Sequence, residues 1–380
     1  MTLNHLPKPI FIANPPALRR LADELSREAI IAVDMEANGL YAYQEQVCLI
    51  QFSTTEKDFL VDPLALGKEG IAPLGAIFSA PAIEKVFHAA EYDLIMLQRD
   101  FDFSLTNLFD TMVAARILGW KRVGLGNILE EQFGIKLEKK YQRANWGQRP
   151  LPDEMLTYAQ LDTHYLIELR NRIKAELQEK GRWQLALEDF RLGCQVDASE
   201  HEFDPADPWQ VKGAYDLQPH EAAILKELSH FRAEKARQLD RPVFKVISNR
   251  ALISLAQRQP RNHQELTHIR GVSKRQDRWI GDELLAAIQR GKAAEPIYPP
   301  SRPRPSRAYI DRVDRLLNWR KRRGRKMGVK SDVILPKDII YDLARERPTT
   351  RDELAEVLEA VPWRLEHFGD AILKQLRNSH

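Results

Sequence analysis

Apolar and polar positions follow two different periods in the first half of the chain. Short apolar runs predict buried strands, and stretches with apolar residues three or four apart predict helices. We expect strands at residues 9–13, 30–36, 47–53, 59–61 and 83–88, and helices at 17–27, 71–79, 91–99, 110–118, 125–132 and 153–177. Strands and helices mixed in this way predict an α/β domain with a central sheet.

Two proline-containing segments interrupt the helical patterns of the second half. Residues 201–209 contain two prolines, and residues 295–307 contain five, which is typical of an extended spacer. We therefore predict an α/β domain at 1–203, a small helical domain at 209–293, a linker at 294–307 and a second, divergent helical domain at 308–380.

The two predicted helical domains repeat each other at a constant offset of 88 positions, as from Arg232 to Arg320. At this offset Leu255-Ala256 recurs as Leu343-Ala344, and Gly281-Asp282 recurs as Gly369-Asp370. The register holds without a gap, and the period is too long for a solenoid unit. The sequence therefore predicts two copies of one small all-α domain.

Charge is unevenly spread, although the net charge is only +3. Residues 301–380 hold 19 basic and 12 acidic residues, so the remainder of the chain is acidic. The densest basic run is 320–326, and the aligned run 232–238 is less basic. A basic tail of this kind is typical of a module that binds a polyanion. We expect the two copies to differ in their affinity for the polyanion.

Composition excludes several other classes of protein. Cys48 and Cys194 form neither a Cys-x-x-Cys pair nor a disulfide framework, so zinc ribbons and redox motifs are excluded. The chain has no apolar run long enough to cross a membrane, and its first nine residues lack the apolar core of a secretory signal. A cytoplasmic protein without a membrane partner is the expectation.

Four carboxylates and one phenol are the candidate catalytic residues. Asp34 and Glu36 end the predicted strand 30–36, and side chains two apart in a strand point to the same face. Tyr158 and Asp162 are four apart in a predicted helix and share one face. Asp93 lies near the start of another helix. Such acidic groups suit Mg²⁺ or Mn²⁺.

Two divalent ions about 3.5–4 Å apart can clamp the attacking and leaving oxygens of a phosphodiester. Asp34 is best placed to bridge both ions, Glu36 and Asp162 would complete the shell of one, and Asp93 would reach the second. Tyr158 would orient the attacking water, because a phenol with a pKa near 10 is a better positioner than base at neutral pH.

The order Asp-x-Glu, Asp, Tyr-x-x-x-Asp resembles the tyrosine-bearing branch of the DEDD superfamily of 3′-to-5′ exonucleases. The histidine-bearing branch would have histidine where this chain has Thr157. Similarity to the ribonuclease D family extends to the segments 31–36, 49–53, 86–93, 108–116, 143–146, 149–151 and 158–162. The repeated helical unit resembles the helicase-and-ribonuclease-D C-terminal (HRDC) domain.

This resemblance implies a ribonuclease H-like domain with a mixed sheet flanked by helices. It also implies a metal-dependent 3′-5′ exoribonuclease that trims the 3′ ends of precursor tRNA and other small structured RNAs, releasing nucleoside 5′-monophosphates. One departure is the segment 37–39, where the family often has an aromatic residue directly after the glutamate. The alternatives are an exonuclease of the same fold that acts on DNA, and a catalytically inert RNA-binding adaptor.

Further residues near the carboxylates are candidate substrate contacts. His88 precedes Asp93 and would contact a phosphate or ribose, and Tyr92 would stack on a base. Arg143 and Arg149 belong to a basic stretch and would contact phosphates. A monomer is expected.

Overall fold

The computed structural model describes residues 6–198, 204–301 and 304–377. The chain divides into two compact units, one made of Met1–Glu36, Val47–Ala198 and Arg304–His380, the other of Ala37–Gln46 and Ser199–Pro303. The second helical domain therefore belongs to the same unit as the α/β domain. The four domain boundaries drawn from the sequence stay a prediction.

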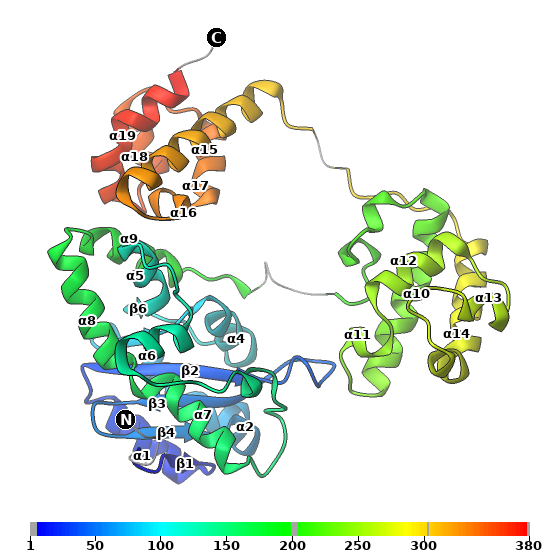
Figure 1. Cartoon of the computed structure of the whole chain (residues 1–380), viewed down its shortest axis with the longest axis horizontal. Coiled ribbons are helices and arrows are strands. Elements are labelled where there is room, and N and C mark those ends of the chain that lie inside the picture. Colours follow the sequence, from blue (N-terminus) through cyan, green and yellow to red (C-terminus); the bar gives the residue numbers. More distant parts are fainter. Residues whose placement is uncertain (1–5, 199–203, 302–303, 378–380) are drawn as a thin grey trace. The chain divides into compact units, whose positions relative to one another are not determined.

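A six-stranded sheet forms the centre of the α/β domain (Figure 1). Its strands are β1 (Ile10–Ile12), β2 (Ile30–Ala37), β3 (Val47–Ser53), β4 (Asp58–Val61), β5 (Glu84–Phe87) and β6 (Leu108–Asp110), in the order β1-β4-β3-β2-β5-β6. β2 and β6 both pair with β5 in parallel, and β3 pairs with β4 in antiparallel. The expected mixed sheet flanked by helices is confirmed.

The helices of this domain are α1 (Pro15–Leu25), α2 (Pro63–Ile71), α3 (Gly75–Ser79), α4 (Glu91–Phe101), α5 (Thr111–Leu118), α6 (Leu125–Phe133), α7 (Asp153–His164), α8 (Leu166–Glu179) and α9 (Trp183–Gly193). Every residue of β3 and β4 is buried, which explains why apolar runs marked both strands in the sequence.

The structure differs from the sequence-based elements at several places. The single helix expected at 153–177 is two helices, α7 and α8, which meet at Tyr165, where ψ is −3°. The sequence did not predict α2, whose start signals Asp62 and Pro63 are followed by Gly67 with φ of 68°, which interrupts the helical geometry. It also missed α9 and the strand β6, which has only three residues and so shows no periodicity.

Two helical domains of matching design follow. The first contains α10 (Pro219–Gln238), α11 (Val243–Val246), α12 (Asn249–Arg258), α13 (His263–Thr267) and α14 (Lys274–Ala293). The second contains α15 (Arg307–Met327), α16 (Ser331–Ile334), α17 (Lys337–Glu346), α18 (Arg351–Val357) and α19 (Pro362–Arg377).

The helices of the two domains start at positions separated by the offset found in the sequence. α12 and α17 both end at a left-handed residue, Gln259 with φ of 47° and Arg347 with φ of 56°. Each domain has its own apolar core, which includes Leu255 in the first and the aligned Leu343 in the second. Within the described residues, no helix is both long and apolar enough to cross a membrane.

Candidate active site

The strand β2 presents Asp34 and Glu36 on one face of the sheet. The preceding residues Ile31, Ala32 and Val33 are fully buried, so this strand is fixed within the core. It lies between β3 and β5 in the sheet. Because alternate side chains of a strand point the same way, both carboxylates face one side.

The helix α7 supplies Tyr158 and Asp162. A buried polar network on β3 and β4 holds the helix in place: Asp58 Oδ2 accepts hydrogen bonds from Gln160 Nε2 at 2.6 Å and from His164 Nδ1 at 2.8 Å. Although burial opposes the change, hydrogen bonds from His164 and Gln160 lower the pKa of Asp58. The charged form of Asp58 therefore anchors the helix that carries Asp162.

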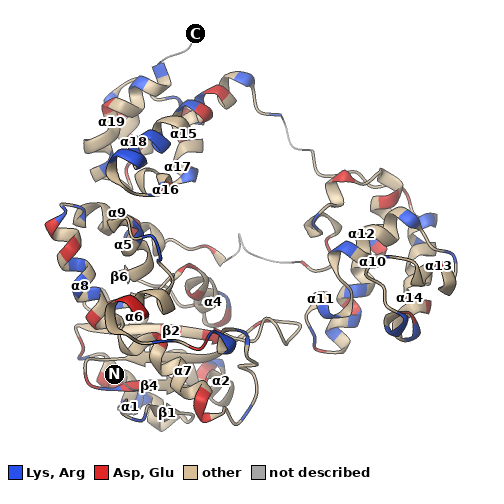
Figure 2. Cartoon of the chain, viewed as in Figure 1, with Lys and Arg blue, Asp and Glu red and all other residues tan. Residues whose placement is uncertain are grey.

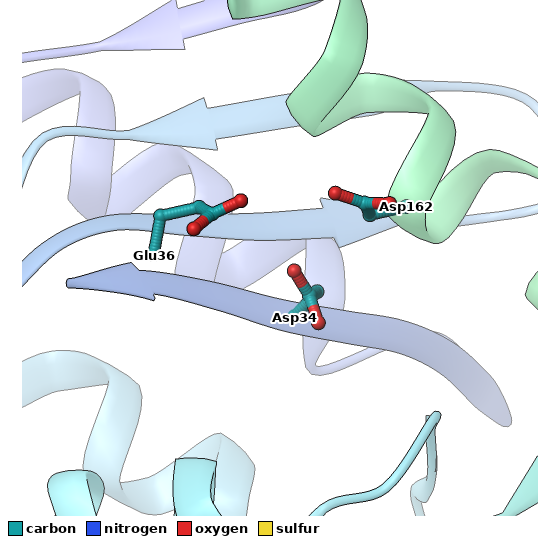
Figure 3. A group of neighbouring side chains, drawn as sticks. All are labelled: Asp34, Glu36 and Asp162. Carbon is teal, nitrogen blue, oxygen red and sulfur yellow. The ribbon is translucent and has the colours of Figure 1, made fainter. Parts of the chain in front are cut away.

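Three of the candidate carboxylates converge on one point. Asp34, Glu36 and Asp162 each offer an oxygen, and these oxygens all lie within 4.8 Å of one another. Figure 3 shows the three side chains, with Asp34 and Glu36 rising from the strand and Asp162 reaching from the helix. The two elements are 126 positions apart in sequence when measured from Glu36 to Asp162, so only the fold joins them.

Mutual repulsion and burial make the ionised forms of these carboxylates costly. Burial raises the pKa of Asp34 to about 7. Burial raises the pKa of Glu36 well above its usual value, and the charges of Asp34 and Asp162 add to the rise. The pKa of Asp162 is also raised well above its usual value, by burial and by Asp34.

Asp93 lies in the first turn of α4 and completes the acidic set. It is 8% exposed. Burial raises its pKa well above the usual value, and the charges of Asp34, Asp110 and Asp162 raise it further. Asp93 lies outside the group of oxygens within 4.8 Å. Its carboxylate nevertheless interacts electrostatically with all three members of that group.

A divalent cation fits this donor set. Carboxylate oxygens are the ligands that Mg²⁺ and Mn²⁺ prefer. The raised pKa values of Glu36 and Asp162 arise from burial and from other carboxylates, so a bound cation would neutralise the repulsion within the cluster.

The phenol of Tyr158 is a hydrogen-bond donor at this site. Its ring is 6% exposed and packs against Trp146, with ring centroids 6.2 Å apart. Burial raises the pKa of Tyr158, and the charges of Asp162 and Glu36 raise it further. A hydrogen bond from Tyr158 lowers the pKa of Asp162. Tyr158 therefore stays protonated and is unsuited to act as a base.

The structure brings some of the proposed substrate contacts near the acidic set. Tyr92 precedes Asp93 on α4 and is 52% exposed. His88 follows β5, and its Nδ1 lies 2.9 Å from Thr111 Oγ1. Burial lowers the pKa of His88, while the charge of Asp110 opposes this. Arg143 is exposed at the end of the short 3-10 segment Lys139–Arg143.

Arg149 has a structural role that the sequence did not indicate, because it binds a buried aspartate. Its guanidinium forms two bonds with Asp62, from Nε at 2.6 Å and Nη2 at 2.7 Å. The remaining donors reach the carbonyl oxygens of Trp146, Gln148 and Cys48. A contact between Arg149 and a phosphate would require one of these hydrogen bonds to break.

Sequence reasoning missed two buried aspartates that support the site. Asp58 holds α7, and Asp110 links the start of α4 to β6 and α5. Asp110 directly before a helix is a capping signal that the sequence displays. Its second set of partners, Ala89 and Ala90, follows only from the parallel pairing of β5 and β6.

Known families match both parts of the chain. The 3′-5′ exonuclease family matches residues 9–178, and the HRDC domain family matches residues 221–288 and 310–376. Exosome complex exonuclease RRP6 of Saccharomyces cerevisiae is 33% identical over 261 residues, which cover 65% of this chain and 36% of that protein. The chain thus spans about a third of the length of this relative.

Solved structures agree with these matches. The catalytic core of RRP6 from Trypanosoma brucei is 31% identical with a TM-score of 0.66, covering 77% of this chain and 82% of that one. RNase D of Escherichia coli is 26% identical with a TM-score of 0.70, covering 97% of this chain and 98% of that one. The chain therefore belongs to the ribonuclease D family of DEDD 3′-5′ exonucleases, with HRDC domains after its nuclease domain.

Proposed function

We propose that this protein is a metal-dependent 3′-5′ exoribonuclease that releases nucleoside 5′-monophosphates. The observation that carries the proposal is the convergence of Asp34, Glu36 and Asp162 within 4.8 Å on the nuclease fold. The structure of the Escherichia coli relative is described as that of an exoribonuclease involved in structured RNA processing, which supports RNA as substrate. Precursor tRNA 3′ ends and other small structured RNAs are the substrates we propose.

The cofactors in this proposal are two Mg²⁺ or Mn²⁺ ions per site. Asp34, Glu36 and Asp162 would hold one, and Asp93, with Asp34, would hold the second. Such a pair of ions supplies a nucleophilic water at neutral pH and stabilises the oxygen that leaves. Tyr158, which stays protonated beside Asp162, would donate a hydrogen bond that orients the attacking water.

Substrate contacts in this proposal come from residues around the carboxylates. Tyr92 would stack on a base, which its exposed ring permits. His88 would contact a ribose or phosphate, and Arg143 would contact a phosphate from its exposed segment. Arg149 would act indirectly, by holding the loop that follows Trp146.

The second helical domain is the better candidate to hold the RNA body. Five residues of its basic run are exposed on α15: Lys321, Arg322, Arg323, Arg325 and Lys326. Figure 2 colours Lys and Arg positions blue along the ribbon of this helix. At the aligned positions of α10, Lys235 pairs with Glu283 and Arg237 pairs with Glu234. The positive charge of the run 232–238 is therefore largely neutralised, whereas that of the run 320–326 is available to phosphates.

The first residue of each basic run has a structural role. Arg232 is 2% exposed, and its Nη1 donates to Asn249 Oδ1 at 2.5 Å. Burial lowers the pKa of Arg232 to about 10. The aligned Arg320 donates from Nη1 to the carbonyl oxygen of Leu335 at 2.8 Å. RNA contacts would therefore begin after Arg320.

The proposal also includes that the protein is a monomer and that it acts in the cytoplasm.

One assay tests this function against both alternatives. A tRNA precursor with a 3′ extension, and a DNA oligomer that matches the extension, are incubated with the full chain in Mn²⁺, Mg²⁺ or EDTA. We expect products that shorten by single nucleotides from the RNA alone, and only with metal. Shortening of DNA alone would favour the DNA exonuclease, and no release from any 3′-hydroxyl RNA would favour the inert adaptor.

A further inference from the structure

One buried carboxylate, that of Asp110, joins the starts of two helices. Asp110 ends β6 and is 4% exposed. Within its own helix α5 its Oδ1 accepts hydrogen bonds from Met112 N at 2.8 Å and Val113 N at 3.0 Å. Across the loop after β5 it accepts from Ala89 N at 3.1 Å and Ala90 N at 2.8 Å.

The helix α4 depends on this outside partner. Its own N-cap residue is Ala90, which has no side chain able to cap, and Ala89 has a left-handed φ of 67°. An alanine adopts that conformation only at a conformational cost, so contacts from the surroundings must hold it. Asp110 supplies both the acceptor oxygens and the negative charge that the N-terminus of α4 favours.

Asp93 lies in the turn that Asp110 fixes. It follows Ala90 by three residues, so a displaced helix start would move its carboxylate. The charge of Asp110 is close enough to contribute to the raised pKa of Asp93. In contrast, the turn of α7 that carries Asp162 is held by the separate network around Asp58.

We infer that Asp110 is a positioning residue, which holds the first turn of α4 so that Asp93 faces Asp34 and Asp162. The inference rests on the proposed function in so far as Asp93 is a metal ligand. Asp110 itself would touch neither the metal nor the substrate, because it is 4% exposed, lies outside the converging oxygens and accepts hydrogen bonds from four backbone N–H groups.

Two substitutions separate this role from simple capping of α5. Asp110→Asn keeps the size of the side chain, and its amide oxygen can keep the three hydrogen bonds at Oδ1 while its nitrogen faces the N–H of Ala90. Asp110→Ser keeps a good N-cap for α5, while its shorter side chain withdraws from Ala89 and Ala90. Both variants therefore loosen α4 and leave the cap of α5 at least partly intact.

The test measures metal binding and activity on the full chain. Mn²⁺ alone is titrated by calorimetry, and RNA hydrolysis is followed at saturating Mn²⁺. We expect the affinity for one of two Mn²⁺ ions to fall by about 10–100-fold in both variants, with kcat reduced to a similar extent and KM little changed. Hydrogen exchange should show lost protection at Ala90 in both variants and at Ala89 in Asp110→Ser, with Val113 still protected.

The matched control is Thr350→Ala, which removes another helix cap, the hydrogen bond from Glu353 N to Thr350 Oγ1 at 3.2 Å in the second helical domain. It should lower stability and leave Mn²⁺ affinity unchanged. A folded Asp110→Asn or Asp110→Ser protein that binds Mn²⁺ as the wild type does would overturn the inference. If the wild type binds Mn²⁺ but hydrolyses no RNA, the proposed function fails while the binding data still decide the role of Asp110. A wild-type chain that binds no Mn²⁺ overturns both.

Discussion

Arg364 of α19 donates a hydrogen bond from Nη1 to Glu188 Oε2 of α9 at 2.9 Å, although 176 positions separate them in sequence. The side chains of both residues are almost fully buried, at 0% and 2% exposure. Nη2 reaches Asp189 at 2.7 Å, and the carbonyl oxygens of Val333 and Ile334 take remaining donors. The pair therefore fixes the second helical domain to the nuclease domain within one unit.

Replacing Arg364 by methionine should destabilise this unit strongly. A buried pair that loses one partner leaves an uncompensated charge, here Glu188, and such changes cost about 3–5 kcal/mol. Urea denaturation of the full chain measures the loss. The control is Arg351→Met, because the ion pair of Arg351 with Asp370 is exposed at 52% and 89% and should contribute less than about 1 kcal/mol. If both variants lost the same free energy of unfolding, the buried ion pair would contribute no more to stability than the exposed one.

The docking of the second helical domain also decides how RNA binding should be tested. Deleting the domain would uncover Glu188 and confuse affinity with stability, so point substitutions on α15 are the better choice. Replacing Lys321, Arg322 and Arg325 by alanine should weaken RNA binding about tenfold or more and flatten its dependence on salt, because fewer counterions are released. Fluorescence anisotropy at several salt concentrations measures both effects.

The matched control for that triple variant removes the same charge elsewhere. Arg19, Arg20 and Arg27 are exposed basic residues on and just after α1. Alanine at these three positions should leave both affinity and salt dependence nearly unchanged. If this control lost as much affinity as the α15 variant, net charge rather than a specific surface would explain the binding.

The sequence predicted the local features of the fold better than the distant ones. β3 was placed at its observed bounds because each of its residues is buried and apolar runs mark it. The pairing of Arg364 with Glu188 was beyond prediction, because nothing in the local pattern of either helix distinguishes these residues from exposed charges. The hydrogen bonds of Arg149 to Asp62 were not predicted for the same reason, since the two residues are 87 positions apart.

A second buried cation, Lys85, gives the stability a dependence on pH. Lys85 is 0% exposed on β5, and its Nζ donates to Ala80 O at 2.7 Å. Burial lowers the pKa of Lys85 from 10.5 to about 8. The unfolded chain therefore keeps a proton that the folded chain releases, so this residue makes the free energy of unfolding rise with pH between about 8 and 10.5.

Lys85→Met should remove that contribution. The difference in free energy of unfolding, variant minus wild type, should fall by on the order of 1–3 kcal/mol as pH rises from about 7 to about 10. Urea denaturation at several pH values measures it. Lys57→Met, at an exposed lysine, serves as the control. Parallel pH profiles for Lys85→Met and wild type would contradict the assigned charge state.

The spacing of the candidate carboxylates along the chain identified them in the sequence. The fold is what brings them together in space. Strand and helix periods predicted that Asp34 pairs with Glu36 and that Tyr158 pairs with Asp162. No periodicity indicates that β2 and α7 meet, and the expectation that Glu36 and Asp162 share one ion came from the chemistry of the carboxylates and from the resemblance to a family. Nothing in the sequence indicated that Asp110 would hold the start of α4. Long-range hydrogen bonds of buried carboxylates leave no periodic trace in a sequence.

Tyr158→Phe tests the weakest of the catalytic assignments. If the phenol orients water and supports Asp162, its removal should lower kcat by about 10–100-fold, with little change in Mn²⁺ affinity for the remaining carboxylates. Steady-state hydrolysis of the RNA and calorimetric titration with Mn²⁺ measure the two quantities. A variant with wild-type kcat would leave Tyr158 as a packing residue against Trp146.

Asp34→Asn should separate catalysis from stability. Turnover should fall by several orders of magnitude, because this residue is proposed to hold both ions. In EDTA, however, the variant should be more stable than the wild type at about pH 8. Burial raises the pKa of Asp34 to about 7, so the folded wild type favours the protonated carboxyl and loses stability as pH rises through that value.

At about pH 5 the carboxyl of folded Asp34 is largely protonated, while that of the unfolded chain, with its ordinary pKa of 3.8, is mostly ionised, so the difference in stability should be smaller than at pH 8. Denaturation in EDTA at both pH values, with and without added Mn²⁺, measures the effect, and Asp23→Asn at an exposed carboxylate serves as the control. Added Mn²⁺ should reverse the order at pH 8, because only the wild type keeps all its ligands. If the Asp34→Asn protein were less stable than the wild type in EDTA at pH 8, ionised Asp34 would not destabilise the metal-free folded state, and the prediction would be wrong.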